Sequence, residues 1–158
     1  MKALSTLLIF LMAFSSAVFA GETKKQVQTD TGYSYSIVTD LSFEEALEKI
    51  PGELEKEGFG IVSRLDVTET MKKKLNKDMK PYMILGACNA DFAYKALQAE
   101  EQIGLMLPCN VIVYENDAGK TVISAVDPAA AMKAVDNEEL SKIAEEVGSR
   151  LKKVIERL

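Results

Sequence analysis

The chain has 158 residues with 19 basic and 24 acidic side chains, a net charge of −5, and it contains neither His nor Trp. The acidic balance argues against binding to nucleic acid or to an anionic membrane surface, because both rely on clustered Lys and Arg. The absence of His excludes Ser-His-Asp and Cys-His triads, His-rich zinc sites and proximal-His haem ligation. We therefore predict no cofactor and no metal site.

The first twenty residues are predicted to be a cleavable export signal. Lys2 precedes an apolar run from Leu7 to Phe14, and small residues follow as far as Ala20, which is the order of a signal peptide. The run is shorter than the ~20 residues that span a bilayer. Cleavage after Ala20 would remove 20 of 158 residues and leave 138, with 18 basic and 24 acidic side chains and a net charge of −6. We predict a periplasmic or secreted protein with a flexible leader over 21–31 and a single domain over 32–158.

The first half of this domain is predicted to alternate between strands and helices. The expected elements are a strand over 33–39, a helix over 43–57, a strand over 59–65 and a helix over 67–77. Ser42 and Glu45 match a capping box at the start of the first helix, and Asp66 begins a similar pattern at the second. Pro51 is expected to kink or divide the first helix.

The second half adds three more strands and the longest helix. The expected elements are a strand over 81–87, a helix over 91–101, an extended return over 102–108, strands over 110–114 and 121–126, a helical turn from Asp127, and a helix from Glu138 to the C-terminus. The apolar seam of the last helix predicts packing on its own sheet, with a helix-helix dimer contact as the alternative. The pattern indicates an α+β two-layer sandwich with a mixed or antiparallel sheet of about five strands.

The cysteines invite chemistry by their type. Cys88 and Cys109 are each followed by Asn, and both fall at predicted strand ends. Four interpretations remain open: a disulfide formed after export, two buried inert thiols, a redox or soft-metal site, and thiols that line a pocket for an organic ligand. A disulfide requires the two strands to be antiparallel neighbours with the thiols close together.

An ordered set of motifs carries a family resemblance. The set includes Gly86-Ala87-Cys88-Asn89, Ala93-Tyr94-Lys95-Ala96-Leu97, Leu107-Pro108-Cys109-Asn110-Val111 and Asp127-Pro128. It resembles the family called domain of unknown function 302, over about 31–135. The resemblance implies a compact α+β domain that pairs as a homodimer, and no activity is established for the family as a whole.

The resemblance also selects the site residues. The matched positions are Cys88, Asn89, Cys109 and Asn110, with Asp66, Lys74, Tyr82 and Asp127 as secondary candidates. Each has a plain alternative: the Asn side chains satisfy backbone groups where strands end, the two Asp residues cap helices, Lys74 is solvated and Tyr82 belongs to the core.

The function predicted from the sequence is a noncatalytic small-ligand binding or interaction module framed by the two Cys-Asn corners, with no catalytic residues. The alternative is a thiol-dependent redox or soft-metal-handling protein that uses Cys88 and Cys109. A carboxylate-pair hydrolase has less support, because the many Glu residues fall on predicted solvated helix faces.

Overall fold

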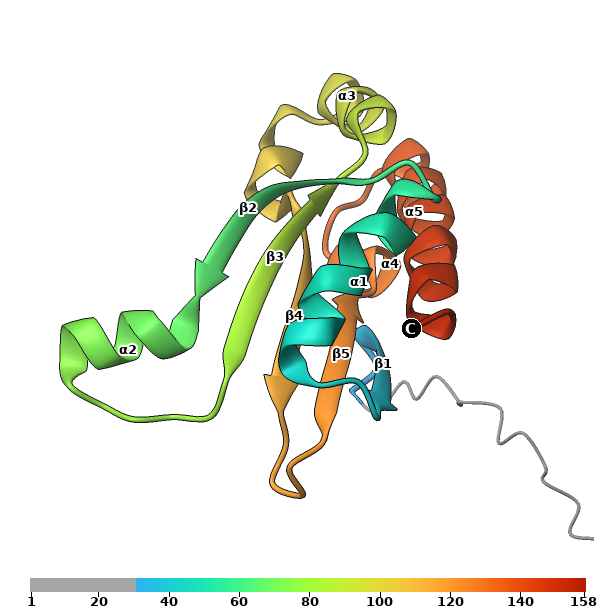
Figure 1. Cartoon of the computed structure of the whole chain (residues 1–158). Helices are drawn as coiled ribbons and strands as arrows, with labels where there is room; N and C mark the ends of the chain where they lie inside the picture. The colour runs from blue at the N-terminus through green and yellow to red at the C-terminus, as the bar shows by residue number, and fades with distance from the viewer. Residues whose placement is uncertain (1–30) are drawn as a thin grey trace, which may run out of the picture.

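A computed structural model of the protein describes residues 31–158, so the predicted signal peptide and residues 21–30 of the leader lie outside the described residues. The elements along the chain are β1 (Ser34–Thr39), α1 (Phe43–Glu55), β2 (Gly60–Asp66), α2 (Val67–Leu75), β3 (Tyr82–Cys88), α3 (Ala90–Ala99), the 3-10 helix η1 (Glu101–Met106), β4 (Cys109–Glu115), β5 (Thr121–Val126), α4 (Pro128–Ala131) and α5 (Glu138–Glu156) (Figure 1).

The five strands form one antiparallel sheet in the order β1-β5-β4-β3-β2. The α+β class is confirmed, and of the two predicted sheet types the antiparallel one is present. β3 and β4 are neighbours, as the disulfide hypothesis required. The two edges of the sheet are β1, near the N-terminal end of the described chain, and β2.

Helices α1 and α5 cover one face of this sheet (Figure 1). Ile50 of α1 and Leu151 of α5 are fully buried there against Val111 and Ile123 of the two central strands. The apolar seam of α5 is buried in this core. The prediction that the seam packs on its own sheet is therefore confirmed.

Local sequence signals explain most helix ends, with two differences. The capping box at α1 is formed, with Ser42 N donating to Glu45 Oε2 at 2.8 Å and Glu45 N donating to Ser42 Oγ at 3.2 Å. Pro51 lies inside α1 without dividing it. The expected extended return over 102–108 is wrong for most of its length, because η1 occupies Glu101–Met106 and buries Ile103 in a small second core between α3 and α5.

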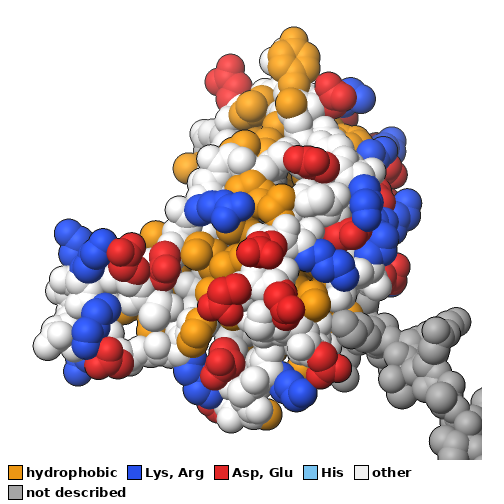
Figure 2. Space-filling model, in the orientation of Figure 1, with side chains coloured by type: hydrophobic (Ala, Val, Ile, Leu, Met, Phe, Trp, Pro, Cys, Tyr) orange, Lys and Arg blue, Asp and Glu red, His pale blue; other side chains and the backbone are white. Residues whose placement is uncertain are grey.

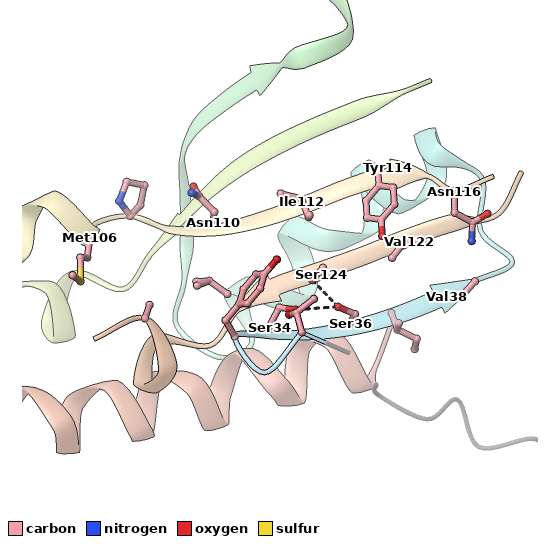
Figure 3. Close-up of a pocket in the computed structure, with 16 residues that line it drawn as sticks. Ser34, Ser36, Val38, Met106, Asn110, Ile112, Tyr114, Asn116, Val122 and Ser124 are labelled. Atoms are coloured by element: carbon pink, nitrogen blue, oxygen red, sulfur yellow. Dashed lines mark hydrogen bonds between the residues drawn. The ribbon is translucent and has the colours of Figure 1, made fainter. Parts of the chain in front are cut away.

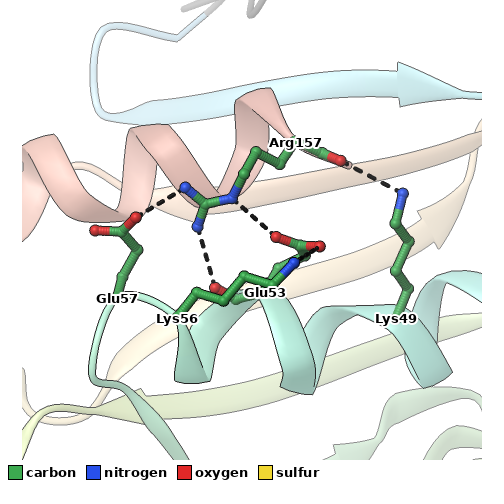
Figure 4. Close-up of polar contacts among 5 residues, drawn as sticks. All are labelled: Lys49, Glu53, Lys56, Glu57 and Arg157. Atoms are coloured by element: carbon green, nitrogen blue, oxygen red, sulfur yellow. Dashed lines mark hydrogen bonds and ion pairs between the residues drawn. The ribbon is translucent and has the colours of Figure 1, made fainter.

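The C-terminal end of α5 is held to α1 by a cluster of charges (Figure 4). Arg157 Nε donates to Glu53 Oε2 at 2.8 Å, and Arg157 Nη1 donates to Glu57 Oε1 at 2.8 Å. Lys56 Nζ contacts the other oxygen of Glu53 at 2.7 Å. The hydrogen bonds from Lys56 and Arg157 lower the pKa of Glu53. This carboxylate is therefore ionised at neutral pH although its side chain is buried.

Residues 60–80, which we call the β2–α2 arm, form the least covered part of the described chain. α2 projects beyond the β2 edge of the sheet, away from α5, and buries none of its residues (Figure 1). Leu75 is 62% exposed, and Val62, Leu65 and Met79 are exposed as well. No helix in the described range is long and apolar enough to cross a membrane.

Candidate functional site

The sheet register decides how the two Cys-Asn corners meet. Cys109 is the partner of Ala87, and Asn110 is the partner of Gly86. Cys88, the last residue of β3, is therefore one residue out of register with Cys109, the first residue of β4. Both cysteines are free thiols in the structure. The disulfide, one of the four interpretations left open by the sequence, is not formed, and the register sets Ala87 rather than Cys88 opposite Cys109.

The two thiols line a small apolar cavity between the sheet, α3 and α5. Cys88, Asn89, Phe92 and Cys109 are among its lining residues, and its volume is about 30 Å³. This is the volume of one water in the liquid, which is too small for an organic ligand. Burial raises the pKa of the Cys109 thiol to about 11, with a smaller contribution from Cys88, so this thiol stays protonated and weakly nucleophilic at neutral pH.

Asn89 has a structural role at the start of α3. Its Oδ1 accepts hydrogen bonds from the backbone N of Asp91 at 3.1 Å and of Phe92 at 3.2 Å, as an N-cap residue does. The same side chain packs against Gly58, where an added Cβ would lie 2.8 Å from Asn89 Nδ2. Gly58 also has a φ of 80°, which favours glycine. The first Cys-Asn corner thus joins the end of α1 to the start of α3.

Asn110 leads instead to the other face of the sheet, which α1 and α5 leave open. Along β4, Asn110, Ile112 and Tyr114 alternate with Val111 and Val113 of the core, so they project away from the helices. They line a hollow of about 660 Å³, which we call the open-face hollow. Its lining residues are Thr31, Tyr33, Ser34, Ser36, Ile37, Val38, Met106, Pro108, Asn110, Ile112, Tyr114, Asn116, Val122, Ser124, Val126 and Ala131 (Figure 3).

A chain of hydroxyl groups crosses the floor of the open-face hollow from β1 to β5. Ser36 Oγ lies 2.7 Å from Ser124 Oγ, Ser34 Oγ lies 3.4 Å from Ser36 Oγ, and Thr31 Oγ1 lies 2.9 Å from Ser34 Oγ (Figure 3). Ser34 and Ser124 are buried in the floor. Each hydroxyl both donates and accepts, so the row can offer either function to a bound molecule.

Aromatic rings border the same hollow. Tyr114 stacks on Tyr82 of β3 with ring centroids 5.5 Å apart and an interplanar angle of 20°. The pKa of Tyr82 is raised, first by burial and then by the neighbouring phenols of Tyr114 and Tyr33. Tyr82, a secondary candidate from the sequence, therefore belongs to an aromatic group beside the hollow.

The remaining secondary candidates lie elsewhere. Asp66 caps α2 by accepting from Glu69 N at 2.8 Å, and Asp127 caps α4 by accepting from Ala129 N at 3.0 Å, so the capping alternative holds for both. Lys74 is exposed on α2. Asp66 and Lys74 belong to the β2–α2 arm, whereas Asp127 directly precedes Pro128, which lines the same small cavity as Cys88 and Cys109.

The described lining of the hollow carries no charged side chain. None of its 16 described lining residues is Asp, Glu, Lys or Arg. Within residues 31–158, no group of three or more Cys, Asp or Glu side chains is placed to hold a metal ion. The arrangement can enclose, stack on and hydrogen-bond a molecule.

Together, the fold and the hollow define a class: a small α+β domain with one sheet face under helices and the other open over an uncharged concavity. The chain belongs to the family described as domain of unknown function DUF302, whose sequence model matches residues 35–158. The resemblance seen in the motifs is thereby confirmed.

A solved structure supports the same assignment. The protein is similar to the crystal structure of an uncharacterized conserved DUF302 protein from Bacillus stearothermophilus, with 28% sequence identity and a TM-score of 0.75. The match covers 79% of this chain and 97% of that chain. No curated protein matches the chain significantly.

Proposed function

We propose that this protein is a noncatalytic module that binds a small molecule in the open-face hollow. The observation that carries the proposal is the hollow itself, whose volume of about 660 Å³ lies within the usual range of ligand sites. Its floor combines apolar side chains such as Val122 with the serine hydroxyls, which is the mixture that binding sites use to hold and orient a ligand. The absence of charged groups among the lining residues that the structure describes favours binding over acid-base catalysis.

The two Cys-Asn corners then have different roles. Asn110 stands at the edge of the hollow and is exposed, so its amide is available to a ligand. Cys88, Asn89 and Cys109 lie at the 30 Å³ cavity and support the packing of α3 on the sheet end. The binding site that we propose therefore includes one corner rather than both.

The thiol-dependent alternative has less support. A redox or soft-metal site requires thiolates, and the pKa of Cys109 is raised to about 11 by its burial. A metal would also need further ligands, whereas the cavity around the two thiols is otherwise lined mainly by apolar side chains such as Phe59 and Phe92.

The proposal is tested by titrating the mature protein with the fluorescent probe N-phenyl-1-naphthylamine. We expect saturable binding that weakens at least tenfold in Ile112→Trp, because the indole fills the hollow. The matched control is Tyr94→Trp, which adds the same indole on exposed α3 outside the hollow and should bind as the wild type does. Equal binding by all three proteins would overturn the proposal.

We also propose that the protein is exported and works as a homodimer. Export rests on the signal-like first twenty residues. Pairing is supported by the exposed apolar side chains of the β2–α2 arm and by the apolar surface over β3, between β2 and α1 (Figure 2). Light scattering on the mature chain tests it, and a monomer mass at every concentration would reject it. Leu75→Glu should weaken a dimer that forms through the arm.

A further inference from the structure

We infer that the ligand of the open-face hollow is an uncharged molecule with a flat apolar ring system and a hydroxyl or amide edge. This inference rests on the proposed function and adds the chemical class of the ligand. Three features of the hollow carry it: the charge of its lining, the row of hydroxyls on its floor and the tyrosines at its side.

The lining is uncharged although the protein is not. Charged residues make up 27% of the chain, so about four of the 16 lining residues within the described range 31–158 would be charged by composition, and none of these 16 is. A second hollow of about 710 Å³ shows the contrast, since Lys133, Asp136, Glu138 and Glu145 line it. A charged ligand would lose water on entering the open-face hollow and gain no opposite charge there.

The charges nearest one end of the hollow already have partners. Lys80 Nζ donates to the backbone oxygen of Asn116 at 2.7 Å and lies 2.9 Å from Asp117 Oδ1. Lys120 Nζ lies 3.0 Å from Asp40 Oδ1 across the same hairpin end. Because these cations face carboxylates, they leave little net attraction for an anion at this end of the hollow.

The polar groups that line the hollow are neutral, and its serine hydroxyls form one row from β1 to β5. The hydroxyls of Ser34, Ser36 and Ser124 form a continuous row across the floor, and Asn110 stands on β4 on the same face. A ligand edge with a hydroxyl or amide can exchange hydrogen bonds with such a row in either sense. These neutral groups can orient a bound ligand, but they do not select it by charge.

The ring system follows from the tyrosines. Tyr114 is already stacked on Tyr82, so its ring is held in place before a ligand enters. A stacked pair offers a further ring an offset or edge-on contact, which is worth about 0.5–1.5 kcal/mol beyond the area it buries. Ile112 and Val122, which also line the hollow, provide apolar floor for the same flat body.

The test compares two probes with the same ring system and different charge. N-phenyl-1-naphthylamine is neutral, and 8-anilinonaphthalene-1-sulfonate carries a sulfonate. We expect the neutral probe to bind the wild type at least tenfold more tightly. Val38→Lys places a cation at the exposed rim of the hollow, where Val38 is 49% exposed, and should shift the preference at least fivefold toward the sulfonate. Tyr94→Lys, at a residue 67% exposed outside the hollow, should not shift it.

The outcomes separate the two proposals. Equal or tighter binding of the sulfonate by the wild type would overturn the uncharged ligand and leave small-molecule binding intact. Failure of both probes to bind would overturn the proposed function, and the ligand class with it. A third outcome is that the wild type is a dimer and that Val38→Lys is a monomer that binds the probe. This would show that a second copy of the chain occupies the hollow, and it would overturn both the proposed function and the ligand class.

Discussion

Gly86 of β3 and Pro108, the residue before β4, pack directly against each other. A Cβ added to Gly86 would lie 2.5 Å from Pro108 Cγ and closer still to Ser63 Oγ of β2. The glycine of the first motif therefore makes room for the proline of the second. Because Gly86 is also the register partner of Asn110, this contact positions the edge of the open-face hollow.

Substituting Gly86 with Ala should destabilise the protein by about 1–3 kcal/mol, because overpacking forces backbone and side chains apart. The urea unfolding midpoint measures this cost. Gly60→Ala is the control, since an added Cβ there meets no atom within 4 Å, and we expect a change within about 0.5 kcal/mol. Gly86→Ala should also weaken probe binding through the displaced Asn110. A variant as stable as Gly60→Ala would show that the contact relaxes at no cost.

Much of the fold follows from local signals in the sequence. The Ser42–Glu45 capping box, the alternation in β1 and the apolar seam of α5 each act within a few residues, so the elements they define are present close to their expected bounds. The 3-10 helix after α3 depends on burial of Ile103 against Ala96 and Leu140. Leu140 comes more than thirty residues later in the chain, which is why a local pattern did not reveal it.

The site was less predictable for the same physical reason. Whether Cys88 opposes Cys109 depends on one residue of register, which a single chain does not reveal. The hydroxyl row joins Ser36 to Ser124, 88 positions apart, and only the pairing of β1 with β5 brings them together. The alternation of Ser34 and Ser36 was visible in the sequence, but it did not say which strand lay beside it.

The two thiols should differ sharply in reactivity. With the pKa of Cys109 at about 11, only about one molecule in a thousand carries this thiolate at pH 8. We expect Cys88, left alone in Cys109→Ala, to react with 5,5′-dithiobis(2-nitrobenzoate) at least a hundredfold faster than Cys109 does in Cys88→Ala. Unfolding in urea should make the two variants equal. A wild-type protein with no free thiol after oxidation in air would contradict the register argument.

Tyr35 should make the protein sensitive to alkali. Its pKa is raised to about 12, first by burial and then by the charge of Asp127 and a hydrogen bond to it. A raised pKa means that the folded state prefers the protonated phenol, so this stabilisation is complete below about pH 10 and is lost as the pH rises toward 12. Tyr35→Phe should cost about 1 kcal/mol at pH 7 and show a weaker loss of stability between pH 10 and 12.

The control for Tyr35 is Tyr94→Phe, which removes an exposed phenol on α3. It should leave both the stability at pH 7 and the alkaline loss unchanged. Urea unfolding at pH 7, 10 and 11 measures all three proteins. Identical alkaline profiles for the wild type and Tyr35→Phe would assign the loss to another group.

The ion pairs of Arg157 join α5 to α1, and their contribution to stability should be lost in acid. The pKa of Glu53 is lowered by its hydrogen bonds from Lys56 and Arg157, so its contribution to stability is present above about pH 4.5 and is lost as the pH falls. Arg157→Ala should cost about 1–2 kcal/mol at pH 7, because it removes charge-assisted hydrogen bonds to a carboxylate that is only 10% exposed. Lys142→Ala breaks an exposed pair with Glu138 and should cost less than about 0.5 kcal/mol.

Acid unfolding separates the charge of Glu53 from its packing. Glu53→Gln keeps the shape of the side chain and removes its titration, so its unfolding free energy should fall less between pH 7 and pH 3.5 than that of the wild type. The double variant Glu53→Gln/Arg157→Ala should lose less than the sum of the two single changes, because Arg157 donates to Glu53 at 2.8 Å and residues in contact are coupled. Additive losses would mean that Arg157 acts mainly through Glu57 instead.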